Sequence, residues 1–186
     1  VLTGASSRKP GRELQICCER FGLPADAVGD FVHLIRTHQP AIVLPRASRT
    51  VLQKLRAGWR LGVLTNGLPD LQARKIDALG LRFLVDTVVF ANQVGDGSGK
   101  PAREAFVEVA CRLQVPTDRI VFVGDDERCD MFGAARAGMR TIHFTGMLKQ
   151  TPGRPALDAD ATIESLAAVP DLAARLVAQR WRSDVA

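Results

Sequence analysis

From residue 60 onward the sequence repeats one pattern, a short apolar run followed by a helical segment. The apolar runs lie at 61–64, 87–91, 120–123 and 141–144, and the helices predicted between them lie at 69–79, 101–113 and 130–137. Continuous apolar strands of this length, alternating with helices, are typical of a parallel sheet buried on both faces. Right-handed crossovers between such strands predict an α/β fold with a doubly wound parallel sheet, a Rossmann-like three-layer sandwich.

The two ends of the chain differ from this repeat. The first 58 residues predict helices without a clear strand, at 11–21, 25–38 and 47–57. After the last apolar run, a weak strand is predicted at 161–163 and a final helix at 170–181. The 186 residues suit one domain, or a core with a small inserted subdomain. Because the first residue is Val1 and not Met, we expect the chain to be a fragment, a processed product or the product of an alternative start codon.

Composition narrows the class of protein. No apolar run approaches the ~20 residues that cross a bilayer, and no signal peptide is visible. The net charge of +5 comes from scattered basic residues, and aromatic residues make up only 5% of the chain, so we expect neither a nucleic-acid partner nor a membrane partner. The four cysteines show no zinc-site spacing, which indicates reduced thiols in a cytoplasmic protein. A mildly basic surface favours an anionic substrate. Composition does not indicate an oligomeric state.

Ligands of doubly wound sheets bind at the carboxyl ends of the strands, so the residues just after each strand are the informative ones. Thr65, Asn66 and Gly67 follow the first apolar run and precede a helix. A hydroxyl, an amide and the free N–H groups of a helix N-terminus can together hold a phosphate group. The alternative is a turn in which Asn66 only caps the helix.

Lys100 follows the second apolar run, at the end of the glycine-rich stretch 95–99, and Pro101 begins the next helix. A lysine in this place puts a cation beside the strand-end crevice, although it could also be a solvated loop residue. A phosphate-binding P-loop is excluded, because Val94 stands where that motif needs glycine and Pro101 where it needs Ser or Thr. The glycines predict more backbone freedom than a catalytic lysine would favour.

Four acidic residues lie within six positions after the third apolar run: Asp125, Asp126, Glu127 and Asp130. Carboxylate oxygens suit Mg²⁺, which retains several waters and takes one or two protein carboxylates. Helix capping explains one such residue but not the cluster. Repulsion among the carboxylates also favours a bound cation, so the sequence predicts a magnesium site here.

These three motifs together resemble those of the haloacid dehalogenase-like superfamily of hydrolases. The matching segments are Leu-Thr-Asn-Gly at 64–67, Lys-Pro at 100–101, and 124–130 with the small residues beyond it. The resemblance covers about 40–163 and is nearest to the nucleotidase and phosphoglycolate phosphatase branch. It implies that residues 1–45 are a partial helical cap and that 46–186 are an α/β hydrolase core lacking its first strand.

The resemblance also implies roles for the residues. Thr65 and Lys100 would be catalytic, with Thr65, Asn66 and Gly67 binding the phosphoryl group. Asp125 would be a magnesium ligand, and Asp130 would support the metal or orient the lysine. These roles imply a magnesium-dependent phosphatase that acts on a small phosphorylated metabolite or nucleotide through an aspartyl-phosphate intermediate. The role of Asp126 stays open, since its position varies in the family.

One element of the family pattern is missing. The nucleophile belongs to an Asp-x-Asp motif upstream of the cap, and the first aspartate of this chain is Asp26, among predicted helices. We therefore expect the chain alone to be inactive, and the strands ending at Leu64 and Val123 to flank an empty strand position. A ligand-binding or regulatory domain that has lost catalysis is the alternative. A 2-haloacid dehalogenase is a further one, although the acid cluster argues against it.

Overall fold

The computed structural model describes residues 12–146 and 159–183, and it divides into two compact units, residues 1–40 and 41–186. In the first unit, helix α1 (Glu13–Phe21) ends at Gly22, whose φ of 62° is left-handed, and α2 (Ala27–Thr37) follows. Cys18 of α1 is buried, whereas α2 has no buried residue. The unit is therefore a small helical pair, as the helix-forming pattern of these residues predicts.

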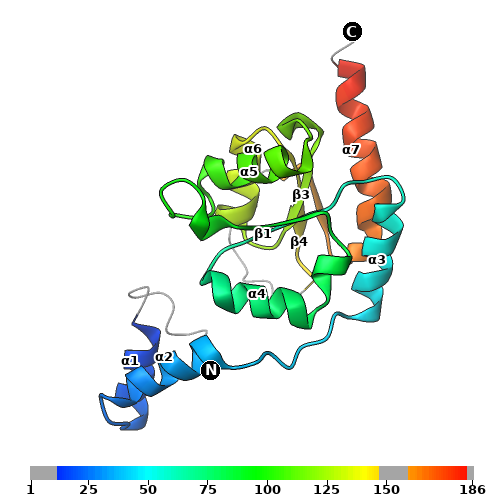
Figure 1. Ribbon diagram of the computed structural model, residues 1–186. Helices are drawn as coiled ribbons and strands as arrows, with labels where there is room; N and C mark the ends of the chain where they lie inside the picture. The colour runs from blue at the N-terminus through cyan, green and yellow to red at the C-terminus, as the bar shows by residue number, and fades with distance from the viewer. Residues whose placement is uncertain (1–11, 147–158, 184–186) are drawn as a thin grey trace. The chain divides into compact units, whose positions relative to one another are not determined.

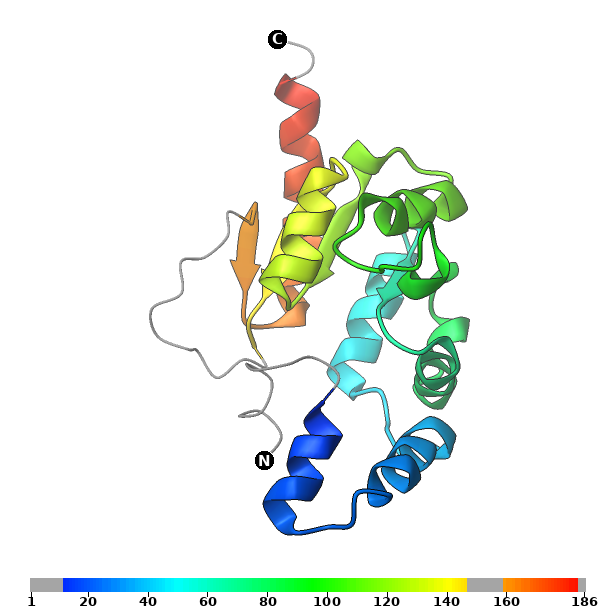
Figure 2. The same ribbon diagram turned by 90° about the vertical axis from the view of Figure 1, so that its left-hand side faces the viewer.

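The second unit contains five strands in two parallel sheets (Figure 1 and Figure 2). Strand β1 (Gly62–Thr65) pairs with β2 (Thr87–Phe90), with Leu64 opposite Val89. In the other sheet β4 (Arg140–Phe144) lies between β3 (Val121–Gly124) and β5 (Ala161–Ile163). The strands alternate with helices along the chain, which confirms the predicted α/β fold.

The helices of this unit lie close to their predicted places. Their bounds are Arg46–Arg56 (α3), Pro69–Ala78 (α4), Arg103–Leu113 (α5), Phe132–Arg136 (α6) and Val169–Ser183 (α7). Short 3₁₀ turns lie at Leu81–Phe83, Ala91–Gln93, Thr117–Arg119 and Leu166–Ala168, and a π-helical turn, η4, lies at Glu127–Met131. No helix in the described ranges has the length and apolar character that a membrane span requires.

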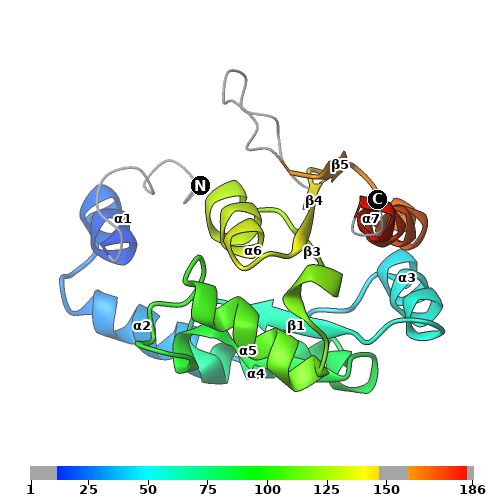
Figure 3. The ribbon, with the colours of Figure 1, turned by 90° about the horizontal axis from the view of Figure 1, so that it is seen from above.

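Two of the three hydrophobic clusters in the described residues lie on the two faces of the strands. Viewed from above, α6 lies on one side of the β3–β4–β5 sheet, and α3 and α7 lie on the other (Figure 3). The α6 side is centred on the fully buried Phe106 of α5, which meets Phe122 edge-on at 5.1 Å between ring centroids. The opposite cluster joins α3 and α7 around Ile142, whose exposed fraction is 0%. This is the sandwich that a sheet buried on both faces requires.

Strands β1 and β3 are not hydrogen-bonded to each other, and no described segment pairs with either on the open side. Both nevertheless pack into the same two clusters. Leu64 and Phe122 contact the α5–α6 cluster, while Val121 and Leu61, the residue just before β1, contact the α3–α7 cluster. All residues of β3 are only partly buried, in contrast to the buried centre of β4. Direct pairing of the two strands therefore does not occur in the described residues, and the empty strand position between them stays a prediction.

Candidate functional site

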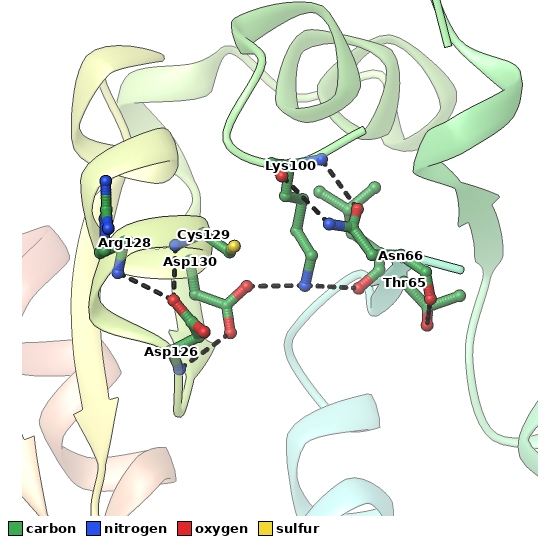
Figure 4. A network of polar contacts seen from close by, with 8 residues as sticks. Thr65, Asn66, Lys100, Asp126, Arg128, Cys129 and Asp130 are labelled. Carbon is green, nitrogen blue, oxygen red and sulfur yellow. Dashed lines mark hydrogen bonds and ion pairs between the residues drawn. The ribbon is translucent and has the colours of Figure 1, made fainter. Parts of the chain in front are cut away.

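Lys100 connects the two sheets at the carboxyl ends of their strands. Its Nζ lies 2.6 Å from Oδ1 of Asp130 and 3.5 Å from the carbonyl oxygen of Leu64, the last residue but one of β1 (Figure 4). The exposed fractions of the lysine and aspartate side chains are 12% and 6%. The ammonium group also lies 5.9 Å from the ring centroid of Phe122. A nearly buried cation is thus held by charge and packing directly at the strand ends.

Asp130 is fixed by close packing as well as by charge. Its Oδ2 accepts a hydrogen bond of 3.3 Å from the backbone N–H of Asp126. Gly124, the last residue of β3, lies directly against the carboxylate: a Cβ placed there would be 2.7 Å from Asp130 Cγ, closer than side chains approach. The residue at position 124 therefore has to be glycine for Asp130 to reach Lys100 in this arrangement.

Asp126 and Asp125 lie in different surroundings. Asp126 is the N-cap of η4, and its Oδ1 accepts hydrogen bonds from the backbone N–H groups of Arg128, at 2.9 Å, and Cys129, at 2.6 Å. Asp125 is exposed, and its carboxylate makes no hydrogen bond or ion pair with any residue in the described ranges. Its backbone oxygen lies 3.2 Å from Nε2 of the buried His143. Asp125 is consequently free to bind a ligand, whereas Asp126 is occupied as a helix cap.

Thr65, Asn66 and Gly67 form the turn between β1 and α4. The Thr65 hydroxyl makes one long hydrogen bond, 3.3 Å to the carbonyl oxygen of Asn66. The Asn66 carboxamide bonds the backbone of Lys100, with its Oδ1 accepting from the Lys100 N–H at 2.7 Å and its Nδ2 donating to the Lys100 carbonyl at 3.0 Å. Gly67, with a φ of 110°, donates its N–H to Oδ1 of Asn92 at 2.7 Å. The three residues thus lie where β1 ends, and Thr65 makes the weakest contact with its neighbours.

Sequence reasoning missed two residues near the strand ends, Asn92 and Cys129. Asn92 directly follows the predicted strand 87–91, so the rule that pointed to Thr65 could also have pointed to it. Cys129 lies in η4, whose irregular geometry the sequence pattern does not reveal. Partial burial, and secondarily the carboxylate of Asp126, raise the pKa of the Cys129 thiol. The thiol is therefore protonated at neutral pH and is a poor nucleophile.

A divalent cation would find part of its ligand set at the end of β3. No cluster of three His, Cys, Asp or Glu residues able to hold a metal is found within residues 12–146 and 159–183. Asp125 supplies one unengaged carboxylate at the end of β3, and Asp130 lies in the adjoining turn with Lys100 bound to Oδ1. Hard oxygen donors with room for water fit Mg²⁺, which takes few protein ligands. The residues therefore fit one side of a magnesium site.

Known proteins resemble this chain in sequence and in fold. The chain is 36% identical to a glyceraldehyde 3-phosphate phosphatase of Methanopyrus kandleri over 100 residues, which cover 54% of this chain and 42% of that protein. It is 35% identical to a phosphoserine phosphatase of Thermus thermophilus over 98 residues, 53% of this chain and 39% of that protein. The matches thus span less than half the length of these curated relatives.

The fold likeness extends further along the chain. The solved structure of the HAD-hydrolase YfnB from Bacillus subtilis, bound to magnesium, superposes with a TM-score of 0.73 at 18% identity and covers 92% of this chain and 75% of that one. The family model described as haloacid dehalogenase-like hydrolase matches residues 12–138, well over half of the chain. The chain with its Lys100–Asp130 pair at the strand ends therefore belongs to the haloacid dehalogenase-like hydrolases.

Proposed function

We propose that this chain is part of a magnesium-dependent phosphatase that acts on a small phosphorylated metabolite or nucleotide. The observation that carries the proposal is the nearly buried Lys100 ammonium, which is paired with Asp130 where β1 and β3 end. This ammonium, with the Thr65 hydroxyl at the end of β1 and the Asp125 carboxylate just after β3, suits a phosphoryl group, whose oxygens carry negative charge. Both curated relatives described above are phosphatases. The free cysteines support a cytoplasmic location.

Each residue has a distinct part in this proposal. Lys100 stabilises the charge that phosphate and an attacking carboxylate share, while Asp130 holds the ammonium in place. Thr65 donates a hydrogen bond to a phosphoryl oxygen, and the turn at Asn66 and Gly67 shapes its seat. Asp125 would bind Mg²⁺, with Asp130 at the edge of the metal's surroundings. When bound, the ion would neutralise phosphoryl oxygens.

The nucleophile of this reaction would come from a segment outside residues 12–146 and 159–183. The predicted open position between β1 and β3 supports this assignment, because a strand seated there would end beside Lys100, which spans from Leu64 to Asp130. A carboxylate on that strand would meet the ammonium directly. The alternative, a domain that binds phosphorylated ligands without turnover, predicts that no such carboxylate is supplied.

The coding sequence immediately upstream of Val1 provides the first test. An in-frame apolar run ending in Asp-x-Asp supports the proposal, and its absence favours the ligand-binding alternative. Magnesium-dependent hydrolysis of p-nitrophenyl phosphate should be absent from the 186-residue chain and present in a protein extended by that segment. In the extended protein, Lys100→Ala should lower the rate about 10²–10³-fold. Robust turnover by the 186-residue chain would place the nucleophile elsewhere and refute the assignment.

A further inference from the structure

The backbone of Lys100 is held by one side chain at both of its polar groups. Asn66 accepts from the Lys100 N–H at 2.7 Å and donates to the Lys100 carbonyl at 3.0 Å (Figure 4). Only a carboxamide offers an acceptor and a donor side by side in this way, because a carboxylate cannot donate and a hydroxyl is too short to span both groups. Asn66 therefore joins the end of β1 to the residue 34 positions further along the chain.

A second carboxamide ties the same two segments together. Asn92 accepts from the Gly67 N–H at 2.7 Å and donates to the Gly97 carbonyl at 3.0 Å. It lies in the 3₁₀ turn Ala91–Gln93 after β2, so it links the turn after β1 to the glycine-rich loop that leads into Lys100. The hydrogen bonds of the two amides together restrict the backbone of this loop, which its glycines would otherwise leave flexible.

The two carboxamides converge on Gly99, the residue before Lys100. Gly99 is buried and has a left-handed φ of 74°. A Cβ at this position would lie 2.8 Å from Oδ1 of Asn66 and 2.9 Å from Nδ2 of Asn92, closer than side chains normally approach. The glycine thus allows both amides to reach the loop, which makes the arrangement a built contact and not a chance pair of surface hydrogen bonds.

We propose that Asn66 and Asn92 are positioning residues for Lys100. Together they set the lysine backbone so that Nζ reaches Asp130 and the Leu64 carbonyl. The inference rests on the proposed function insofar as Lys100 stabilises the phosphoryl group, but the positioning itself concerns only the folded chain. In this proposal Asn66 affects the reaction by positioning Lys100, and not by contacting the substrate directly.

Chemical labelling of Lys100 in the 186-residue chain tests the positioning without any turnover. Trace acetylation with acetic anhydride, read by mass spectrometry, gives the rate at Lys100 relative to the exposed Lys54 of α3. Asn66→Ala should raise the relative rate roughly tenfold, the change expected from losing two ordinary hydrogen bonds, and Asn92→Ala should raise it less. Gln93→Ala, an amide truncation at the neighbouring exposed position, should leave it unchanged. Equal relative rates in folded Asn66→Ala and Gln93→Ala proteins would overturn the proposal.

Asn66→Asp keeps the test decisive if Asn66→Ala does not fold. The carboxylate retains the acceptor for the Lys100 N–H but cannot donate to the Lys100 carbonyl. Amide hydrogen exchange at Lys100 should stay slow in this variant while acetylation of Nζ becomes faster. Unchanged acetylation would show that the link to the carbonyl does not position the lysine.

In an active, extended protein, a double-mutant cycle separates positioning from substrate contact. If Asn66 acts through Lys100, then Asn66→Ala should lower kcat in the wild-type background and cost little more in the Lys100→Ala background. Additive losses would show a direct contact with substrate and overturn this part of the inference. Absence of any hydrolysis would count against the proposed function alone, because the labelling result does not depend on it.

Discussion

Lys100 and Asp130, 30 positions apart in the chain, form an ion pair of 2.6 Å with both side chains almost wholly buried. Removing one partner of such a pair leaves an uncompensated charge, which costs about 3–5 kcal/mol of unfolding free energy. We therefore expect Lys100→Met and Asp130→Asn each to destabilise the chain by about 3 kcal/mol in urea unfolding. The double variant should lose less than the sum. Additive losses would mean that the two charges do not interact in the folded protein.

Gly124→Ala should destabilise the protein through a steric clash. The added methyl group would meet Asp130 at a distance where atoms repel, so Asp130 or the end of β3 has to move. Overpacking of this kind costs about 1–3 kcal/mol, measurable as a lower melting temperature. Gly58→Ala is the matched control, because a Cβ at position 58 has no atom within 4 Å. Equal melting temperatures for the two variants would contradict the close packing of Gly124 against Asp130.

Asp160 should make the stability of the fold depend on acidic pH. Its carboxylate accepts hydrogen bonds from the Thr141 N–H, at 2.8 Å, and from Arg140, at 2.6 Å. Burial alone would raise the pKa of Asp160, but the hydrogen bonds to Thr141 and Arg140 outweigh it and hold the pKa below its ordinary value. The stabilisation is therefore fully present above the unfolded pKa of about 3.9 and is lost as the pH falls through the folded pKa.

Asp160→Asn isolates this contribution. We expect the variant to be less stable than wild type by about 1 kcal/mol at pH 7. The difference should shrink as the pH falls below about 4, because the wild-type carboxyl group becomes neutral as well. Unfolding free energies measured between these pH values provide the check, and a difference that is constant with pH would contradict the role of the charge.

Asp125 should carry the weak magnesium affinity of the chain. Isothermal titration calorimetry with Mg²⁺ should show Asp125→Asn binding roughly tenfold more weakly than wild type, since one charged oxygen ligand is lost. Asp171→Asn, at an exposed acid in the first turn of α7, should bind as wild type does. If Asp125→Asn and wild type bind equally, Asp125 is not a ligand.

The strand positions were predictable within one or two residues. Short apolar runs with β-branched residues, bounded by glycine or proline, favour a strand over any other element. The rule that ligands bind at the carboxyl ends of strands likewise led to Lys100 and Asp130, which the fold brings into contact. The catalytic and metal-binding roles of these residues stay predictions.

The finer geometry was not predictable. A helix was expected to begin at Asp130, but the chain forms a π-helical turn at Glu127–Met131, because Asp126 caps it through two backbone N–H groups. The convergence of Asn66 and Asn92 on Gly99 likewise depends on contacts between distant segments. Neither feature leaves a periodic signal in the sequence, since both arise from single side-chain hydrogen bonds.

The separation of β1 from β3 affects how cooperatively the two halves of the core fold and unfold. Backbone hydrogen bonds couple neighbouring strands, and in the described residues that coupling stops at each open edge. Across this separation, side-chain packing and the Lys100 contacts join the β1–β2 half to the β3–β4–β5 half. We expect the smaller half to open locally while the larger one keeps its ladder, as a separate cooperative unit of lower stability.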